Sequence, residues 1–257
     1  MERLLILGGT GEAAALARAA CGRFGDALEV TTSLAGRTSQ PAPLPGQLRI
    51  GGFGGPEGLT GYLSKHRVDR LIDATHPFAS QISAQARIAC EQASVPRLIL
   101  QRQPWRRHRL DRWIEIGSMS AAAAIVGRVG RRAWLTIGAS EIVCFSAVTG
   151  LHFLVRVVDP PRQPLPLHSC EVIVRRGPFT LLDECRLLRR HAIDVLVCKA
   201  SGGAATEAKI IAARELGLPV IMVRRPAREP GEAVETVEAA LDWIAGSHPC
   251  LQTTKVS

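Results

Sequence analysis

Lysine and aromatic residues are both scarce in this 257-residue chain. Four of its 32 basic residues are lysines, and aromatic side chains make up 4% of the sequence. RNA-binding modules stack bases on aromatic rings, so the low aromatic content argues against nucleic acid as a partner. Codon usage alone can explain the excess of arginine over lysine, but it does not explain the net charge of +9. That charge favours an anionic ligand, such as a phosphate-bearing cofactor or a polycarboxylate.

Long apolar runs and paired cysteines are absent as well. No stretch is long enough to cross a bilayer, and the first apolar run, Leu4–Leu7, meets glycines and Glu12 at once, unlike a signal peptide. We therefore expect a cytoplasmic protein with no membrane partner. The seven cysteines form no Cys-x-x-Cys pair, which predicts buried thiols in a reducing compartment rather than a disulfide framework or a zinc site. Nothing in the sequence requires a metal.

The sequence does contain a regular alternation of short apolar runs and helical patterns. With 46% hydrophobic residues the chain can bury a sizeable core, and the alternation predicts an α/β fold with mainly parallel strands. We expect two Rossmann-like lobes that face each other across a cleft. The predicted ranges are 1–101 for a nucleotide-binding lobe, 102–113 for a basic crossover, 114–246 for a second lobe and 247–257 for a tail.

The first predicted strand, Leu4–Leu7, runs directly into a glycine loop and then into an Ala/Leu-rich helical pattern. This arrangement presents free backbone N–H groups to a phosphate, and the helix N-terminus adds partial positive charge. A glycine cluster can also form a simple tight turn, but the flanking strand and helix favour nucleotide binding. The predicted cofactor contacts in this loop are Gly8, Gly9, Thr10, Gly11 and Glu12.

The loop after the second predicted strand contains no carboxylate from Val30 to Gln47. A fold that prefers NAD usually places Asp or Glu there to hold the ribose hydroxyls. Hydroxyls and one arginine stand in that place and would accommodate the 2′-phosphate of NADP, although an ordinary solvated arginine is the alternative. The predicted cofactor contacts are Ser33, Gly36, Arg37 and Thr38.

Two further loops come after the third and fourth predicted strands. Four glycines in residues 51–55 let a flat group approach the backbone, or make a flexible turn before a helix that begins at Pro56. The loop Asp73–Ala79 combines a carboxylate, a hydroxyl and an imidazole. His76 is a candidate cofactor contact or proton donor, and equally a structural residue before a proline. The predicted cofactor contacts are Gly52, Thr75 and His76.

A second pattern of strand, glycines and helix runs from Cys198 to Lys209 in the other lobe. Its ammonium, hydroxyl and free amides suit an anion such as a substrate carboxylate or the cofactor pyrophosphate. Lys199 and His76 are the candidate catalytic residues, because both lie just after strand ends. The predicted substrate contacts are Lys199, Ser201, Gly202, Gly203, Arg102 and Arg225.

The ordered set of motifs resembles the precorrin-6A reductases, a family of the cobalamin pathway that includes the cobalt-precorrin-6A reductases. The resemblance covers residues 1–245 and rests on segments 8–13, 32–38, 73–79, 199–203 and 219–226. It implies NADPH-dependent reduction of a double bond of the precorrin-6A macrocycle to give precorrin-6B. Hydride would go to one carbon of the C18–C19 bond and a proton to its neighbour. The carboxylates of such a substrate agree with the excess of arginine.

Other functions stay open from the sequence. A non-catalytic NADP-sensing regulator would share the first two loops, but would leave the loop Lys199–Gly203 without a purpose. A short-chain dehydrogenase is excluded, because the single tyrosine, Tyr62, lacks the Tyr-x-x-x-Lys spacing. Both a metal-free and a cobalt-containing substrate remain compatible with the motifs, and the oligomeric state is open.

Overall fold

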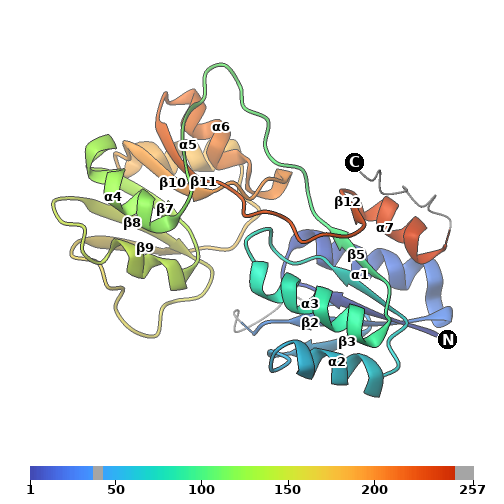
Figure 1. The fold of residues 1–257 in the computed structure, drawn as a ribbon. Helices are drawn as coiled ribbons and strands as arrows, with labels where there is room; N and C mark the ends of the chain where they lie inside the picture. Colours follow the sequence, from blue (N-terminus) through green and yellow to red (C-terminus); the bar gives the residue numbers. More distant parts are fainter. Residues whose placement is uncertain (37–42, 247–257) are drawn as a thin grey trace, which may run out of the picture. The chain divides into compact units, whose positions relative to one another are not determined.

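The computed structural model describes residues 1–36 and 43–246, which form two compact units. Unit 1 comprises the chain up to Gln103 together with the chain from Pro226 on, and unit 2 comprises Pro104–Arg225. Each unit is built on a six-stranded parallel sheet (Figure 1). The predicted α/β class with parallel strands is confirmed. The predicted tail, 247–257, lies outside the described residues.

Unit 1 has the strand order β12-β5-β4-β1-β2-β3. The chain fills the sheet outward from β1 in one direction and from β4 in the other, so the order reverses between these two strands. In open α/β sheets, ligands bind beyond the carboxyl ends of the strands at this switch point. The elements are β1 (Glu2–Leu7), α1 (Gly11–Phe24), η1 (Gly25–Ala27), β2 (Leu28–Leu34), β3 (Gln47–Ile50), α2 (Pro56–Lys65), β4 (Arg70–Asp73), α3 (Ser80–Ala93), β5 (Arg97–Leu100), β12 (Ala233–Val234) and α7 (Val237–Ile244).

Both faces of the unit 1 sheet are covered by helices. Alternate residues of β1 point to opposite faces: Leu4 and Ile6 pack with α1 and α7, while Leu5 and Leu7 pack with α2 and α3. A strand segment buried on both sides must be apolar at every position, which is why β1 is a continuous apolar run from Leu4 to Leu7. The core therefore fixes the sheet, and the loops at its carboxyl edge are left to carry the polar groups.

Unit 2 repeats this architecture with the order β6-β11-β10-β7-β8-β9. Its switch point lies between β7 and β10. The buried core on one face includes Trp134, Leu154 and Leu196, packed with side chains of two helices, α5 and α6. The elements are β6 (Arg112–Ile116), α4 (Met119–Val129), β7 (Arg132–Thr136), η2 (Ala139–Phe145), β8 (His152–Val157), β9 (Cys170–Val174), α5 (Leu181–Arg190), β10 (Val195–Lys199), η3 (Ala204–Thr206), α6 (Ala208–Glu215) and β11 (Pro219–Val223).

The predicted lobe boundaries are wrong at two places. The predicted second lobe, 114–246, loses its last segment to unit 1, because Ala233 and Val234 pair with β5 and Trp243 packs into the core beside α1. Figure 1 shows these red C-terminal elements, β12 and α7, with the blue elements of unit 1. The predicted crossover, 102–113, is divided between the units, and its end already forms the start of β6.

Candidate functional site

The loop between β1 and α1 is fixed at both of its ends. Gly8 donates its amide hydrogen to the Ser33 carbonyl at 2.9 Å, and a Cβ at Gly8 would meet side-chain atoms of β2 at 3.1 and 3.2 Å. Thr10 caps α1, since its Oγ1 accepts from the amide of Ala13 at 3.1 Å. The same hydroxyl donates to the Ala74 carbonyl at 2.7 Å. This last bond joins the β1 loop to the β4 loop at the switch point.

The middle of this loop is open. Within the described residues, the amides of Gly9, Thr10, Gly11 and Glu12 donate no hydrogen bond. A Cβ at Gly9 or Gly11 would meet no described heavy atom within 4 Å, and Gly9 has a φ of +108° that glycine adopts without strain. Open amides at the N-terminus of a 14-residue helix bind phosphate groups. The predicted pyrophosphate site of a dinucleotide rests on these open amides, and it stays a prediction.

Glu12 brings a carboxylate to the same loop, and Arg102 compensates it. The Arg102 guanidinium lies 2.8 Å from the Glu12 carboxylate. The side chains of both residues are mostly buried, so the pair removes a charge that would repel a phosphate at the helix N-terminus. The sequence predicts Arg102 as a substrate contact, and the structure places it beside the predicted phosphate loop.

The carboxyl ends of β2 and β3 carry the next predicted contacts. The Oγ of the buried Ser33 accepts from Arg49 Nη1 at 3.4 Å. The same guanidinium donates to the carbonyl oxygens of Gly51 and Gly52, which ties the glycine loop to β3. Ser33 and Gly52 are thus brought to one place, as predicted, around an arginine that the sequence reasoning missed.

The strand register of the structure explains why Arg49 lies beside Ser33. Ser33 and Arg49 are paired neighbours on β2 and β3, so their side chains share one face of the sheet. Gly36, which comes after β2, has a φ of +72°. Arg37 and Thr38, the two remaining predicted contacts of this loop, lie outside the described residues.

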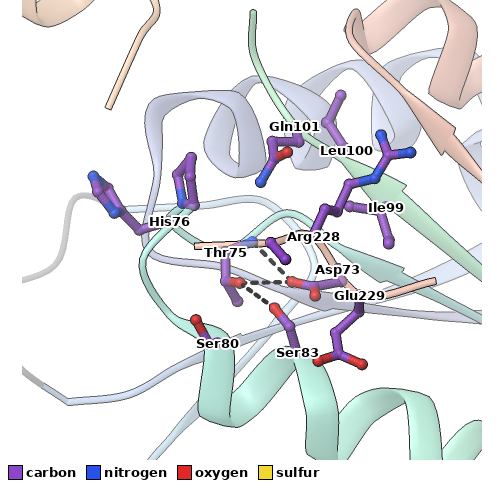
Figure 2. Close-up of a pocket in the computed structure, with 12 residues that line it drawn as sticks. Asp73, Thr75, His76, Ser80, Ser83, Ile99, Leu100, Gln101, Arg228 and Glu229 are labelled. Atoms are coloured by element: carbon purple, nitrogen blue, oxygen red, sulfur yellow. Dashed lines mark hydrogen bonds between the residues drawn. The ribbon is translucent and has the colours of Figure 1, made fainter. Parts of the chain in front are cut away.

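A small depression lies at the carboxyl ends of β4 and β5 (Figure 2). Asp73 at its base is 2% exposed and accepts hydrogen bonds from the amide and the hydroxyl of Thr75, at 3.1 and 2.7 Å. Figure 2 shows the Thr75 hydroxyl hydrogen-bonded to both Asp73 and Ser83. His76 Nδ1 accepts from the amide of Phe78 at 3.2 Å, so the neutral ring carries its proton on Nε2. Thr75 and His76 therefore line one pocket beside a buried carboxylate.

The switch point of unit 2 holds an ion pair. Lys199, the last residue of β10, lies 2.5 Å from a carboxylate oxygen of Glu141 in η2. The same oxygen accepts the amide hydrogen of Gly138 at 3.3 Å. Glu141 was not predicted as a site residue. The available signal was a carboxylate three residues beyond the glycine that follows β7, but no local pattern indicated its approach to Lys199.

The predicted anion loop of unit 2 is held by side chains from distant segments. Arg225 donates to the carbonyl oxygens of Ala200 and Ser201, both at 2.7 Å, and the Trp105 indole donates to the Gly203 carbonyl at 2.9 Å. Gly202 and Gly203 have φ values of +66° and +76°. The structure thus brings the predicted contacts Lys199, Ser201, Gly202, Gly203 and Arg225 together.

The thiols do not add a nucleophile to these sites. The six described cysteines are free, and burial raises the pKa of Cys90 to about 12 and that of Cys198 to about 11. Both are protonated at neutral pH. Among residues 1–36 and 43–246, no group of His, Cys, Asp and Glu is arranged to hold a metal ion. In the same part of the chain, no helix has the length and apolar character that a membrane span needs.

Known proteins match this chain over nearly its whole length. A precorrin-6A reductase from Rhodobacter capsulatus is 44% identical over 245 residues, covering 95% of this chain and 96% of that protein. A cobalt-precorrin-6A reductase from Priestia megaterium is 28% identical over 248 residues, covering 91% and 95%. A solved structure described as CobK precorrin-6A reductase superimposes with a TM-score of 0.91 at 44% identity, covering 96% of this chain and 97% of that one.

The family model described as precorrin-6x reductase CbiJ/CobK matches residues 3–245. That range includes both switch points and every predicted site residue. The chain belongs to the precorrin-6x reductase CbiJ/CobK family.

Proposed function

We propose that this chain is an NADPH-dependent precorrin-6A reductase, which reduces a double bond of the macrocycle to give precorrin-6B. The observation that carries the proposal is the open phosphate loop of unit 1 in a chain 44% identical to proteins named precorrin-6A reductase. Relatives named cobalt-precorrin-6A reductase are 28% identical in Priestia megaterium and Salmonella typhimurium, and 32% identical over 183 residues in Methanothermobacter thermautotrophicus. This difference favours the metal-free substrate.

The bound cofactor supplies the hydride, and the protein supplies its binding and orientation. In this proposal the amides of Gly9–Glu12 hold the pyrophosphate, and Arg102 keeps the Glu12 carboxylate from repelling it. Ser33 lies at the strand edge where this fold holds the adenosine ribose. Thr75 and His76 line the pocket at the ends of β4 and β5. The absence of a carboxylate from Val30 to Gln47 supports NADPH over NADH.

Reduction of a carbon–carbon double bond also needs a proton. Hydride adds to one carbon, the electron pair of the π bond moves to the other carbon, and that carbon takes up a proton. Two groups of this chain are suited to give it: the Nζ of Lys199, held in an ion pair with Glu141, and the Nε2 of His76. We favour Lys199, because its loop also carries the amides that suit substrate carboxylates.

The loop after β10 is the proposed anchor for the substrate. Lys199, Ser201, Gly202 and Gly203 provide an ammonium, a hydroxyl and backbone amides for its carboxylates. Arg225 acts on this loop through two hydrogen bonds to its carbonyl oxygens, which hold the backbone in one conformation. Arg102 is a proposed substrate contact of unit 1.

Turnover with precorrin-6A under anaerobic conditions tests the proposal. NADPH consumption is followed by nicotinamide absorbance, with NADH in a parallel reaction and cobalt-precorrin-6A as a second substrate. We expect precorrin-6B to form, with NADPH strongly preferred over NADH and the metal-free substrate over the cobalt form. Binding of NADPH without turnover of either substrate would contradict the proposal and support a non-catalytic NADP sensor.

A further inference from the structure

Arg49 is a cation of β3 that lies beside the carboxyl end of β2. Leu7, Ser33 and Arg49 form one row of paired residues across β1, β2 and β3. Leu7 is the last residue before the phosphate loop, and the Arg49 guanidinium reaches the Ser33 hydroxyl. The side chain therefore lies at the carboxyl end of β2, the position where dinucleotide-binding sheets distinguish a ribose hydroxyl from a ribose phosphate.

The guanidinium of Arg49 is held in a built environment. Its Nη1 and Nη2 donate to the carbonyls of Gly51 and Gly52, and its plane lies over the Phe53 ring at 3.7 Å from the centroid. The Tyr62 ring lies 5.4 Å away and packs edge-on against Phe53. These contacts hold the guanidinium in place, so little side-chain freedom would be lost on binding a ligand.

Among the described residues, no carboxylate neutralises the charge of Arg49. Five other arginines of unit 1 form salt bridges in that part of the chain, and Arg49 is in none of them. Its described acceptors are a hydroxyl and two carbonyls, all neutral. These acceptors engage three of its five N–H groups and leave one on Nε and one on Nη2. Two adjacent N–H groups form the fork that binds a phosphate through two parallel hydrogen bonds.

We propose that Arg49 binds the 2′-phosphate of the adenosine ribose and thereby sets the preference for NADPH over NADH. The inference rests on the proposed function, because it assumes that a dinucleotide occupies the loop of unit 1. It assigns the specificity to a residue on β3, in contact with β2 and the glycine loop, in addition to Arg37 of the preceding loop. The competing role for Arg49 is a purely structural one, in which it fastens the glycines and binds no ligand.

Binding of adenosine fragments separates these roles without any turnover. Isothermal titration calorimetry would compare 2′,5′-ADP with 5′-AMP, which differ only in the 2′-phosphate, for the wild type and for Arg49→Ala. We expect Arg49→Ala to weaken 2′,5′-ADP binding by about tenfold or more and to change 5′-AMP binding by less than about threefold. Arg49→Lys keeps the charge but loses the fork. We expect its affinity for 2′,5′-ADP to lie between those of the wild type and Arg49→Ala.

The controls address folding and charge. Arg23→Ala removes one positive charge from an exposed ion pair between α1 and α7 and is expected to leave both affinities unchanged. Equal weakening of both ligands by Arg49→Ala would show the structural role and overturn the inference. Competition by inorganic phosphate as strong as that by 2′,5′-ADP would overturn it in favour of a general anion site.

The same titration distinguishes failure of the inference from failure of the proposed function. A wild type that prefers 2′,5′-ADP while Arg49→Ala keeps that preference overturns the assignment to Arg49 and leaves the NADPH reductase intact. A wild type that binds neither fragment nor NADPH contradicts the cofactor assignment of the proposed function, and the inference with it.

Discussion

The two switch points of this molecule have the same topology and different chemistry. In unit 1, Thr10 Oγ1 donates to the Ala74 carbonyl and joins the loops of β1 and β4. In unit 2, Thr136 Oγ1 donates to the Val197 carbonyl at 3.3 Å, so a threonine again joins the two central strands. The helices that begin after these strands differ. A 14-residue α-helix begins at Gly11 after β1, whereas a 3₁₀-helix with Glu141 in its first turn begins after β7.

We expect that difference to decide which unit holds a phosphate. Within the described residues the loop of unit 1 keeps four amides open, while the amide of Gly138 in unit 2 is already bonded to the Glu141 carboxylate. A carboxylate of the protein thus takes the place that an anionic ligand would take, and Lys199 pairs with it. Fold alone therefore does not define a nucleotide site; the loop chemistry does.

The largest effect is expected from a carboxylate placed in the open loop. In Gly11→Asp the new charge lies at the N-terminus of α1, where it favours the helix but repels a phosphate. We expect NADP⁺ binding to weaken by roughly 100-fold or more, with an unchanged or slightly higher Tm, by calorimetry and thermal unfolding. Gly22→Asp, at an exposed position of the same helix, is the matched control. Unaltered NADP⁺ binding in Gly11→Asp would contradict the assignment of the phosphate site to the loop after β1.

A second, smaller effect tests whether unit 2 supplies the proton donor. Lys199→Met removes the proposed proton donor, and we expect kcat to fall by about 100-fold while the Kd of NADP⁺ changes by less than about twofold. Lys65→Met, at the end of α2, is a control that is expected to keep both values. A variant Lys199→Met with wild-type kcat would exclude Lys199 as the donor and direct attention to His76.

The smallest expected effect concerns the pH dependence of the free energy of unfolding. It arises from two buried thiols, one in each unit. Burial raises the pKa of Cys90 and Cys198 from the ordinary 9.0 to about 12 and about 11. Above pH 9 the unfolded chain releases these protons while the folded chain retains them, so the free energy of unfolding decreases as the pH rises towards 11. Cys198→Ala should reduce the loss between pH 8 and pH 10 by about 1 kcal/mol in urea titrations. An identical loss in wild type and variant would contradict this.

Local patterns were predictable from the sequence, and pairings between distant segments were not. The apolar run Leu4–Leu7 and the glycines after it determine β1, the loop and α1 by short-range rules. The two-residue strand β12 is too short to show a pattern, and it becomes a strand only because Val234 pairs with Leu100. The second-lobe boundary was wrong for that reason.

The same limit explains the site residues that were missed. Arg49 has meaning only through its register with Ser33, and Glu141 only through its contact with Lys199, 58 positions along the chain. Arg102 was predicted for its charge, but no local pattern indicated its pairing with Glu12. The sequence therefore indicates which residue types are present, while the residues that they contact are found only in the three-dimensional structure.

Amide hydrogen exchange at the two switch points tests the central claim most directly. The measurement compares peptides covering residues 8–14 and 137–145 with and without saturating NADP⁺. We predict slower exchange at Gly9–Glu12 and no change at Gly138–Glu141, because the first loop offers open amides to a phosphate while a carboxylate of the protein occupies the second. Protection of the loop after β7, with none in the loop after β1, would contradict the account.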